Sequence, residues 1–213
     1  MNTQSTAHSK KPHHHGDLRR ALVQAGIDLL EEGGLPALTL RKCAAKAGVS
    51  HAAPAHHFNG LDGLKAAIAQ EAFRRFSASM LTAAEVGDPS PRGRLKSICR
   101  GYLHFGQTHP ALLQMIFGVT PEEMEAADTD TPGDHEKGTN AYQILSEACA
   151  PFVPAGTDPR IVEIQVWSLA HGFTLLALPG RFIEGGVDHT DALFDQVMAL
   201  LNHVGPTVSP ASP

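Results

Sequence analysis

Apolar residues recur along most of this 213-residue chain at intervals of three and four positions, which is the period of an amphipathic α-helix. The pattern predicts helices at about residues 17–32, 40–47, 51–57, 61–84, 91–108, 110–117, 139–152, 159–178 and 190–204. Proline, glycine and polar clusters separate these segments. Because no segment alternates apolar and polar residues as a half-buried strand does, we expect an all-α fold.

The most informative stretch is the one in which two short helical segments meet at Gly48-Val49-Ser50. Gly48 gives the backbone the freedom to end one helix and turn sharply. Thr39 and Ser50 are suited to cap the N-termini of the two helices. Two helices joined by a short glycine-containing turn are typical of a helix-turn-helix, whose second helix enters the major groove of DNA.

Charge is divided unevenly along the chain. The formal net charge is −5 at pH 7. Residues 1–65 contain 8 Lys and Arg against 5 Asp and Glu, whereas residues 66–213 contain 9 against 17. The part with the helix-turn-helix pattern is therefore basic, as contact with phosphates requires. The acidic part is not expected to approach DNA.

The helix-turn-helix segment resembles the TetR family of bacterial transcriptional regulators, through LTLRKCAAKAGVS at residues 38–50, HHF at residues 56–58 and Leu64. The second half resembles one branch of that family, through YLHFGQTHPALLQMIFG at residues 102–118 and a Trp-x-x-x-His-Gly signature at residues 167–172. The resemblance implies an N-terminal three-helix DNA-binding domain followed by a helical bundle that binds a ligand and dimerises.

Four regions are expected from these patterns. They are a disordered arm at residues 1–16, a helix-turn-helix domain at 17–64, an effector-binding and dimerisation domain at 65–205 and a loose tail at 206–213. The arm contains Lys10, Lys11 and three consecutive histidines. It either touches the phosphates or minor groove of DNA or is a solvated tail.

The resemblance also indicates which residues contact DNA. Arg41 is placed to reach a base edge or a phosphate, and Thr39 lies where exposed backbone amides favour a phosphate. Residues 51–53 align with base-facing positions of the family. The expected DNA-contact residues are Thr39, Arg41, Lys42, Lys46, Ser50, His51, Ala52, Ala53, His56 and His57.

The recognition segment departs from the family pattern at three positions. Ala55 and Leu61 stand where many relatives carry a phosphate-binding Tyr and Lys. We therefore expect weaker or more arm-dependent DNA binding, with Lys65 as one compensating cation. Pro54 replaces a common aliphatic residue and, in a first helical turn, is expected to cost at most one backbone hydrogen bond.

The last two predicted helices are apolar almost all round, so each needs to be buried on two sides. A two-fold homodimer in which these helices form a four-helix bundle would bury them. The family binds effectors between the helices of the second half, and His171 could hydrogen-bond a ligand or a backbone carbonyl. The candidate ligand-binding residues are Phe105, Met115, Phe117, Tyr142, Trp167 and His171.

Together these patterns predict a cytoplasmic, ligand-responsive regulator, and the family favours a repressor that a small molecule releases from a palindromic operator on double-stranded DNA. The alternatives are a helical interaction module that binds no DNA, and an enzyme. No GxSxG, HExxH or phosphate-binding glycine loop occurs, so we expect no enzyme. We also expect no cofactor, no metal site and no membrane span.

The three cysteines, at positions 43, 99 and 149, are far apart in sequence and form no CxxC pair. Reduced core thiols are one interpretation, and a redox sensor is the other.

Overall fold

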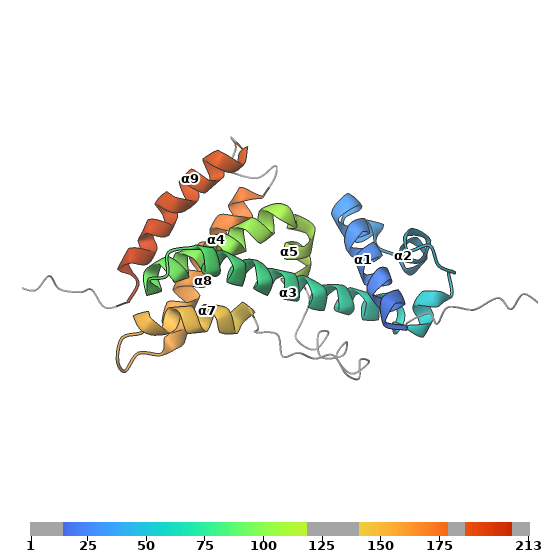
Figure 1. The fold of residues 1–213 in the computed structure, drawn as a ribbon, viewed down its shortest axis with the longest axis horizontal. Helices are drawn as coiled ribbons and strands as arrows, with labels where there is room; N and C mark the ends of the chain where they lie inside the picture. Colours follow the sequence, from blue (N-terminus) through green and yellow to red (C-terminus); the bar gives the residue numbers. More distant parts are fainter. Residues whose placement is uncertain (1–14, 119–140, 179–185, 206–213) are drawn as a thin grey trace, which may run out of the picture. The chain divides into compact units, whose positions relative to one another are not determined.

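A computed structural model describes residues 15–118, 141–178 and 186–205, and every regular element within these ranges is helical (Figure 1). This confirms the all-α fold expected from the sequence. The chain forms two compact units, residues 1–68 and 69–213. Helix α3 (Gly60–Val86) begins in the first unit and continues into the second. Most of the expected arm and all of the expected tail lie outside the described residues.

The first unit packs α1 (His15–Gly33), α2 (Leu40–Lys46) and the beginning of α3 around one apolar core. A 3₁₀ turn, η1 (Leu35–Ala37), follows α1. Leu22, Cys43 and Ile68 are fully buried. Gly26 allows α1 to approach α3 closely, because a Cβ atom at this position would lie only 2.5 Å from Cδ1 of Ile68.

The segment after the turn differs from the helix predicted over residues 51–57. It is a single 3₁₀ turn, η2 (Ala53–His56), and its N-cap is Ala52, with no capping side chain. The prediction that Ser50 caps this helix is therefore wrong. Pro54 lies within this turn and has no backbone N–H to donate to a helical hydrogen bond.

The second unit contains the rest of α3 together with five further helices within the described ranges. These are α4 (Pro91–Thr108), α5 (Pro110–Ile116), α7 (Ala141–Cys149), α8 (Pro159–Ala177) and α9 (Gly186–Met198). The 3₁₀ turns η3 (Ala150–Phe152) and η4 (Ala199–His203) follow α7 and α9.

Sequence signals located some of these helix ends better than others. The predicted starts of α4 and α8 are confirmed, since Ser90 and Asp158 each accept a backbone N–H at 3.0 Å just before a proline. The predicted helix at 190–204 is wrong at both ends. Gly186, with φ at 81°, lets α9 begin earlier, and the hydroxyl of Thr190 donates to the Gly186 carbonyl at 3.0 Å.

Helix α4 is held closely against two neighbours by glycines. A Cβ atom at Gly101 would lie 2.5 Å from the carbonyl oxygen of Ser79 on α3, and one at Gly106 would lie 2.4 Å from Cγ2 of Thr174 on α8. The hydroxyl of Ser79 also donates to the carbonyl of Gly101 at 2.8 Å. These contacts make α4 the helix against which both α3 and α8 are positioned.

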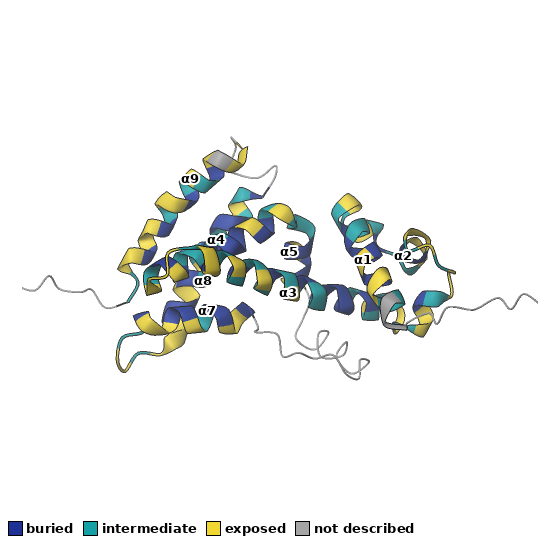
Figure 2. Ribbon diagram, viewed as in Figure 1, coloured by how far each residue is buried: buried dark blue, intermediate teal, exposed yellow. Residues whose placement is uncertain are grey.

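Helix α8 is buried on one side and exposed on the other in the single chain. Figure 2 shows buried and exposed positions alternating in the same way along α7 and α9. Val166 and Ala170 lie in the core. Ile161, Ile164 and Leu176 are 50%, 63% and 49% exposed. An exposed apolar surface of this kind is typical of a surface that another molecule covers.

Replacing Gly101 by Ala should destabilise the protein by about 1–3 kcal/mol, because the new methyl group would force the α3 and α4 backbones apart. Urea unfolding followed by circular dichroism measures the change. The matched control is Gly63→Ala on α3, where the new Cβ meets no atom closer than 3.6 Å. The control should be neutral or stabilising, by up to about 1 kcal/mol, from helix propensity. Equal stability of the two variants would show that the α3–α4 contact is not tight.

Candidate functional site

The backbone around α2 has the geometry that the helix-turn-helix pattern predicts for its first half. The hydroxyl of Thr39 accepts the backbone N–H of Lys42 at 3.2 Å, which confirms Thr39 as the N-cap. At the other end Gly48, with φ at 69°, and Val49 close a Schellman motif. In this motif the Gly48 and Val49 amides bond the Ala45 and Ala44 carbonyls at 3.1 and 3.0 Å. Both ends of the helix are therefore fixed by local hydrogen bonds.

The expected DNA-contact residues fall into two groups by exposure. Cys43 and Ala44 anchor α2 in the core, so the opposite side of the helix faces outward. Thr39, Ala53 and His57 are half-buried. The exposed members are Arg41, Lys42, Lys46, Ser50, His51, Ala52 and His56.

One of these cations already has a partner on the protein. The ammonium group of Lys46 on α2 lies 2.7 Å from the carboxylate of Glu32 on α1, and this hydrogen bond raises the pKa of Lys46. Lys46 must exchange that partner to reach a phosphate. A further cation that sequence reasoning missed is Arg19, whose guanidinium lies 5.3 Å from the ring centroid of Phe58.

In the second unit, five rings from α4, α7, α8 and the residue after α5 form one aromatic cluster. They are linked through Phe117, whose centroid lies 4.5 Å from that of His171, 6.3 Å from Trp167 and 6.4 Å from Tyr102. Tyr142 lies on the far side of Trp167, with centroids 6.3 Å apart. We call these five residues the aromatic cluster.

Hydrogen bonding and burial keep the polar atoms of the aromatic cluster neutral. The hydroxyl of Tyr102 and Nδ1 of His171 are 2.7 Å apart. Burial raises the pKa of Tyr102 and lowers the pKa of His171, so both are uncharged at pH 7. His171 therefore bonds the side chain of Tyr102 on α4. The sequence had pointed only to a ligand or a backbone carbonyl as its partner. Tyr102 was not among the expected ligand-binding residues, although it begins the motif at residues 102–118.

Two of the six expected ligand-binding residues are not among the five rings of the aromatic cluster. Phe105 packs against Phe76 and His109, with centroids 5.2 and 5.4 Å away, and is almost fully buried. Met115 is also buried. The structure brings Phe117, Tyr142, Trp167 and His171 together, and it adds Tyr102 to them.

A buried carboxylate adjoins the aromatic cluster. Glu163 on α8 is 5% exposed and accepts the hydroxyls of Tyr142 and Ser146, each at 2.7 Å. The bond to Glu163 raises the pKa of Tyr142. Two hydrogen bonds compensate the desolvation of this carboxylate and join α7 to α8.

A small cavity of about 20 Å³ lies between α3, α4, α7 and α8, and Tyr102 and Trp167 border it. A volume of this size has room for about one water molecule. Cys99 also borders the cavity, and burial raises the pKa of its thiol to about 12. All three cysteines are free and buried, so their thiolate forms are scarce at pH 7.

Comparison with known proteins connects both units to a single family. Residues 95–201 match the model of the tetracyclin repressor-like C-terminal domain. The chain is 31% identical over 145 residues to the HTH-type transcriptional regulator BetI of Burkholderia mallei, covering 68% of this chain and 71% of that protein. A solved structure of a protein with unknown function from Rhodococcus sp. RHA1 is 29% identical, with a TM-score of 0.65, covering 89% of this chain and 98% of that one.

The chain belongs to the TetR family of transcriptional regulators. It is a ligand-responsive, DNA-binding regulator, as the sequence predicted. The HTH-type transcriptional regulator BetI of Burkholderia ambifaria is 27% identical over 179 residues, which cover 83% of this chain and 89% of that protein.

Two further properties of the described part of this TetR regulator bear on its chemistry. No described helix is both long and apolar enough to cross a membrane. Within residues 15–118, 141–178 and 186–205, no group of three or more His, Cys, Asp or Glu side chains is arranged to hold a metal ion.

Proposed function

We propose that two copies of this regulator bind an inverted-repeat operator and repress transcription until a small molecule releases them. The observation that carries the proposal is the exposed set of cationic and histidine side chains on α2 and the following turn. Cytoplasmic localisation follows from a role on the chromosome. The two DNA-binding units of such a dimer would lie about one DNA turn, roughly 34–36 Å, apart.

Arg41 and Lys42 would contact different parts of the DNA. Both are exposed in the first turn of α2, beside the cap at Thr39. The free backbone amides and the helix dipole there favour a phosphate, to which Lys42 adds a point charge. Arg41 can present two parallel donors to a guanine edge. His51 and Ala52, at the tip of the turn, can bond a base and contact a thymine methyl group.

Replacing Arg41 by Gln should weaken binding to the regulator's own operator by about 1–3 kcal/mol and relax its base preference. Replacing Lys42 by Gln should weaken binding to all sequences alike and reduce the slope of log affinity against log salt by about one. Gel shifts with DNA that flanks the regulator's own gene measure both effects. Arg94→Gln, an exposed substitution on α4, is the control and should leave affinity unchanged. Unchanged affinity in all three variants would remove α2 from the DNA interface.

The dimer is supported by the exposed side of α8. Ile161, Ile164, Ser168, Gly172 and Leu176 follow one another at intervals of three and four residues, so they form one stripe along the helix. Large apolar residues stand at its ends, and the small Ser168 and Gly172 at its centre let a partner helix approach closely. An isologous pair of such stripes, with α9 beside each, makes the four-helix bundle expected from the sequence.

Replacing Ile164 by Glu should convert the dimer to a monomer, because the dimer would bury two unpaired carboxylates near its axis. Gel filtration with light scattering should give about twice the 22.6 kDa chain mass for the wild type and a single chain mass for the variant. Gln143→Glu, at an exposed position on α7, should remain dimeric. A wild-type monomer at micromolar concentration would contradict the dimer.

The aromatic cluster supports an effector site for a small, largely apolar molecule with one hydrogen-bonding group. Its rings are neutral, and Tyr142 and Phe117 are partly exposed, so a ligand can reach them. A ligand that bonds His171 must compete with the Tyr102 hydroxyl, which is on α4. Helix α4 packs closely on α3, and α3 continues into the DNA-binding unit. This is the route by which binding would change operator affinity.

Replacing His171 by Ala should raise the effector concentration needed for half-release from DNA by about tenfold, the effect of losing one hydrogen bond of about 1.4 kcal/mol. Operator affinity without effector should stay the same. The measurement is a fluorescence-anisotropy titration of the DNA complex with a compound identified by thermal-shift screening. His203→Ala, at an exposed position after α9, is the control. If operator affinity and release change together, His171 supports the fold only.

A further inference from the structure

Helix α2 carries three exposed cationic side chains, and one of them is held by a carboxylate of α1. Arg41 and Lys42 form no ion pair with any residue in the described part of the chain. By contrast, the ammonium group of Lys46 lies 2.7 Å from the carboxylate of Glu32. Both helices belong to the first unit, so this ion pair lies within the unit that is proposed to bind DNA.

The ion pair lies close to the side of α2 that is proposed to face DNA. Lys46 is four positions after Lys42, so the two side chains lie one above the other on the same side of the helix. A duplex that contacts Lys42 would therefore also come close to Lys46. Its phosphates would then meet Glu32, whose side chain is 63% exposed. The carboxylate and a phosphate would compete for the same ammonium group.

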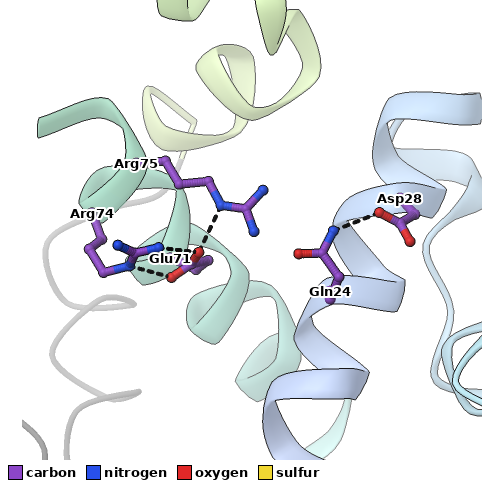
Figure 3. A network of polar contacts seen from close by, with 5 residues as sticks. All are labelled: Gln24, Asp28, Glu71, Arg74 and Arg75. Atoms are coloured by element: carbon purple, nitrogen blue, oxygen red, sulfur yellow. Dashed lines mark hydrogen bonds and ion pairs between the residues drawn. The ribbon is translucent and has the colours of Figure 1, made fainter. Parts of the chain in front are cut away.

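A second acid lies one turn before Glu32 on α1. Asp28 is four positions earlier, on the same side of the helix, and its carboxylate accepts a hydrogen bond from the side-chain amide of Gln24 at 2.7 Å (Figure 3). The hydrogen bond from Lys46 to Glu32 is the main cause of the raised pKa of Lys46, and the negative charge of Asp28 adds to it. Glu32 therefore holds Lys46 directly, whereas Asp28 acts on it only through its charge.

The exposure of the ion pair indicates where its effect is largest. An exposed ion pair contributes little to the stability of a fold, so its loss should hardly affect the packing of α1 on α2. Its effect on DNA binding is of another kind. A free cation that neutralises a phosphate displaces about 0.9 counterions from the duplex, and this release makes the binding favourable at low salt. Lys46 and Glu32 together have no net charge, so the pair would displace few counterions.

We propose that Glu32 competes with DNA phosphates for Lys46 and thereby limits the sequence-independent part of DNA binding. This inference rests on the proposed function. Phosphate contacts hold a regulator on any sequence, whereas base contacts select the operator. A carboxylate that withholds one cation weakens binding to every sequence by a similar factor and leaves the base contacts of Arg41 unchanged. It shortens the time that the regulator spends on unrelated DNA.

Fluorescence anisotropy with the full chain and a short labelled duplex of unrelated sequence, at several salt concentrations, tests the proposal. Glu32→Gln should bind this duplex about fivefold more tightly than the wild type at low salt, and its slope of log affinity against log salt should be steeper by up to about 0.9. The reason is that Lys46 becomes free for one phosphate. A duplex from the DNA that flanks the regulator's own gene should show a similar gain. Glu32→Gln/Lys46→Gln should lose the gain, because it lacks the released cation.

Asp28→Asn is the matched control, because it removes the same charge one turn earlier on α1 and leaves the bond between Lys46 and Glu32 in place. Its slope should change less than half as much as that of Glu32→Gln. Unfolding temperatures verify that all variants are folded. Equal gains in Glu32→Gln and Asp28→Asn, or a gain that persists in the double variant, would overturn the competition.

The wild type separates a failure of this inference from a failure of the proposed function. DNA binding by the wild type with no gain in Glu32→Gln would overturn the role of Glu32 alone. A wild type that binds neither duplex at low salt would overturn the proposed function, and the competition with it.

Discussion

The second unit depends on how closely α4 lies against its two neighbours. Gly101 has no side chain to separate α4 from the α3 backbone, and Gly106 likewise admits Thr174 of α8. Helix α4 is therefore in direct contact with both α3 and α8. Closely packed interiors transmit displacements rather than absorb them. The two glycines therefore set the distances of α4 from α3 and from α8, and α3 is the helix that the two units have in common.

Helix α4 also borders two chemically different environments. The Tyr102 hydroxyl on this helix bonds His171 among neutral rings, with a buried carboxylate at Glu163 nearby. Arg100 on the same helix lies with Arg74 and Arg75 of α3 along an open groove. One helix thus contributes both to an aromatic interior and to a cationic surface.

Local signals in the sequence predicted local structure well. Thr39, Gly48 and the prolines at 91 and 159 each act through hydrogen bonds or backbone angles within a few residues, and each marks a helix end in the structure. Pro54 lies in a 3₁₀ turn where the helical pattern predicted a longer helix, and it lacks the N–H that such a helix would use.

Contacts between helices were harder to predict. Periodicity gives the face of a helix on which a side chain lies, but not the neighbour that the face meets. Tyr102 and Phe105 are three positions apart on α4 and both contact the ring of Phe76, yet only Tyr102 also contacts Phe117 and His171. Glu163 stands in an apolar helix, where an isolated acid signals a buried hydrogen-bond partner, but Tyr142 and Ser146 could not be named from spacing.

Trp167 is the only tryptophan in the chain, and it lies between Phe117 and Tyr142 in the aromatic cluster. Its indole emission therefore comes from one place, half-buried among other rings beside the small cavity. The polarity around the indole of Trp167 determines the wavelength of its emission, and quenching by neighbouring groups determines the intensity. The protein thus carries an intrinsic optical reporter of events in the cluster, with no attached dye.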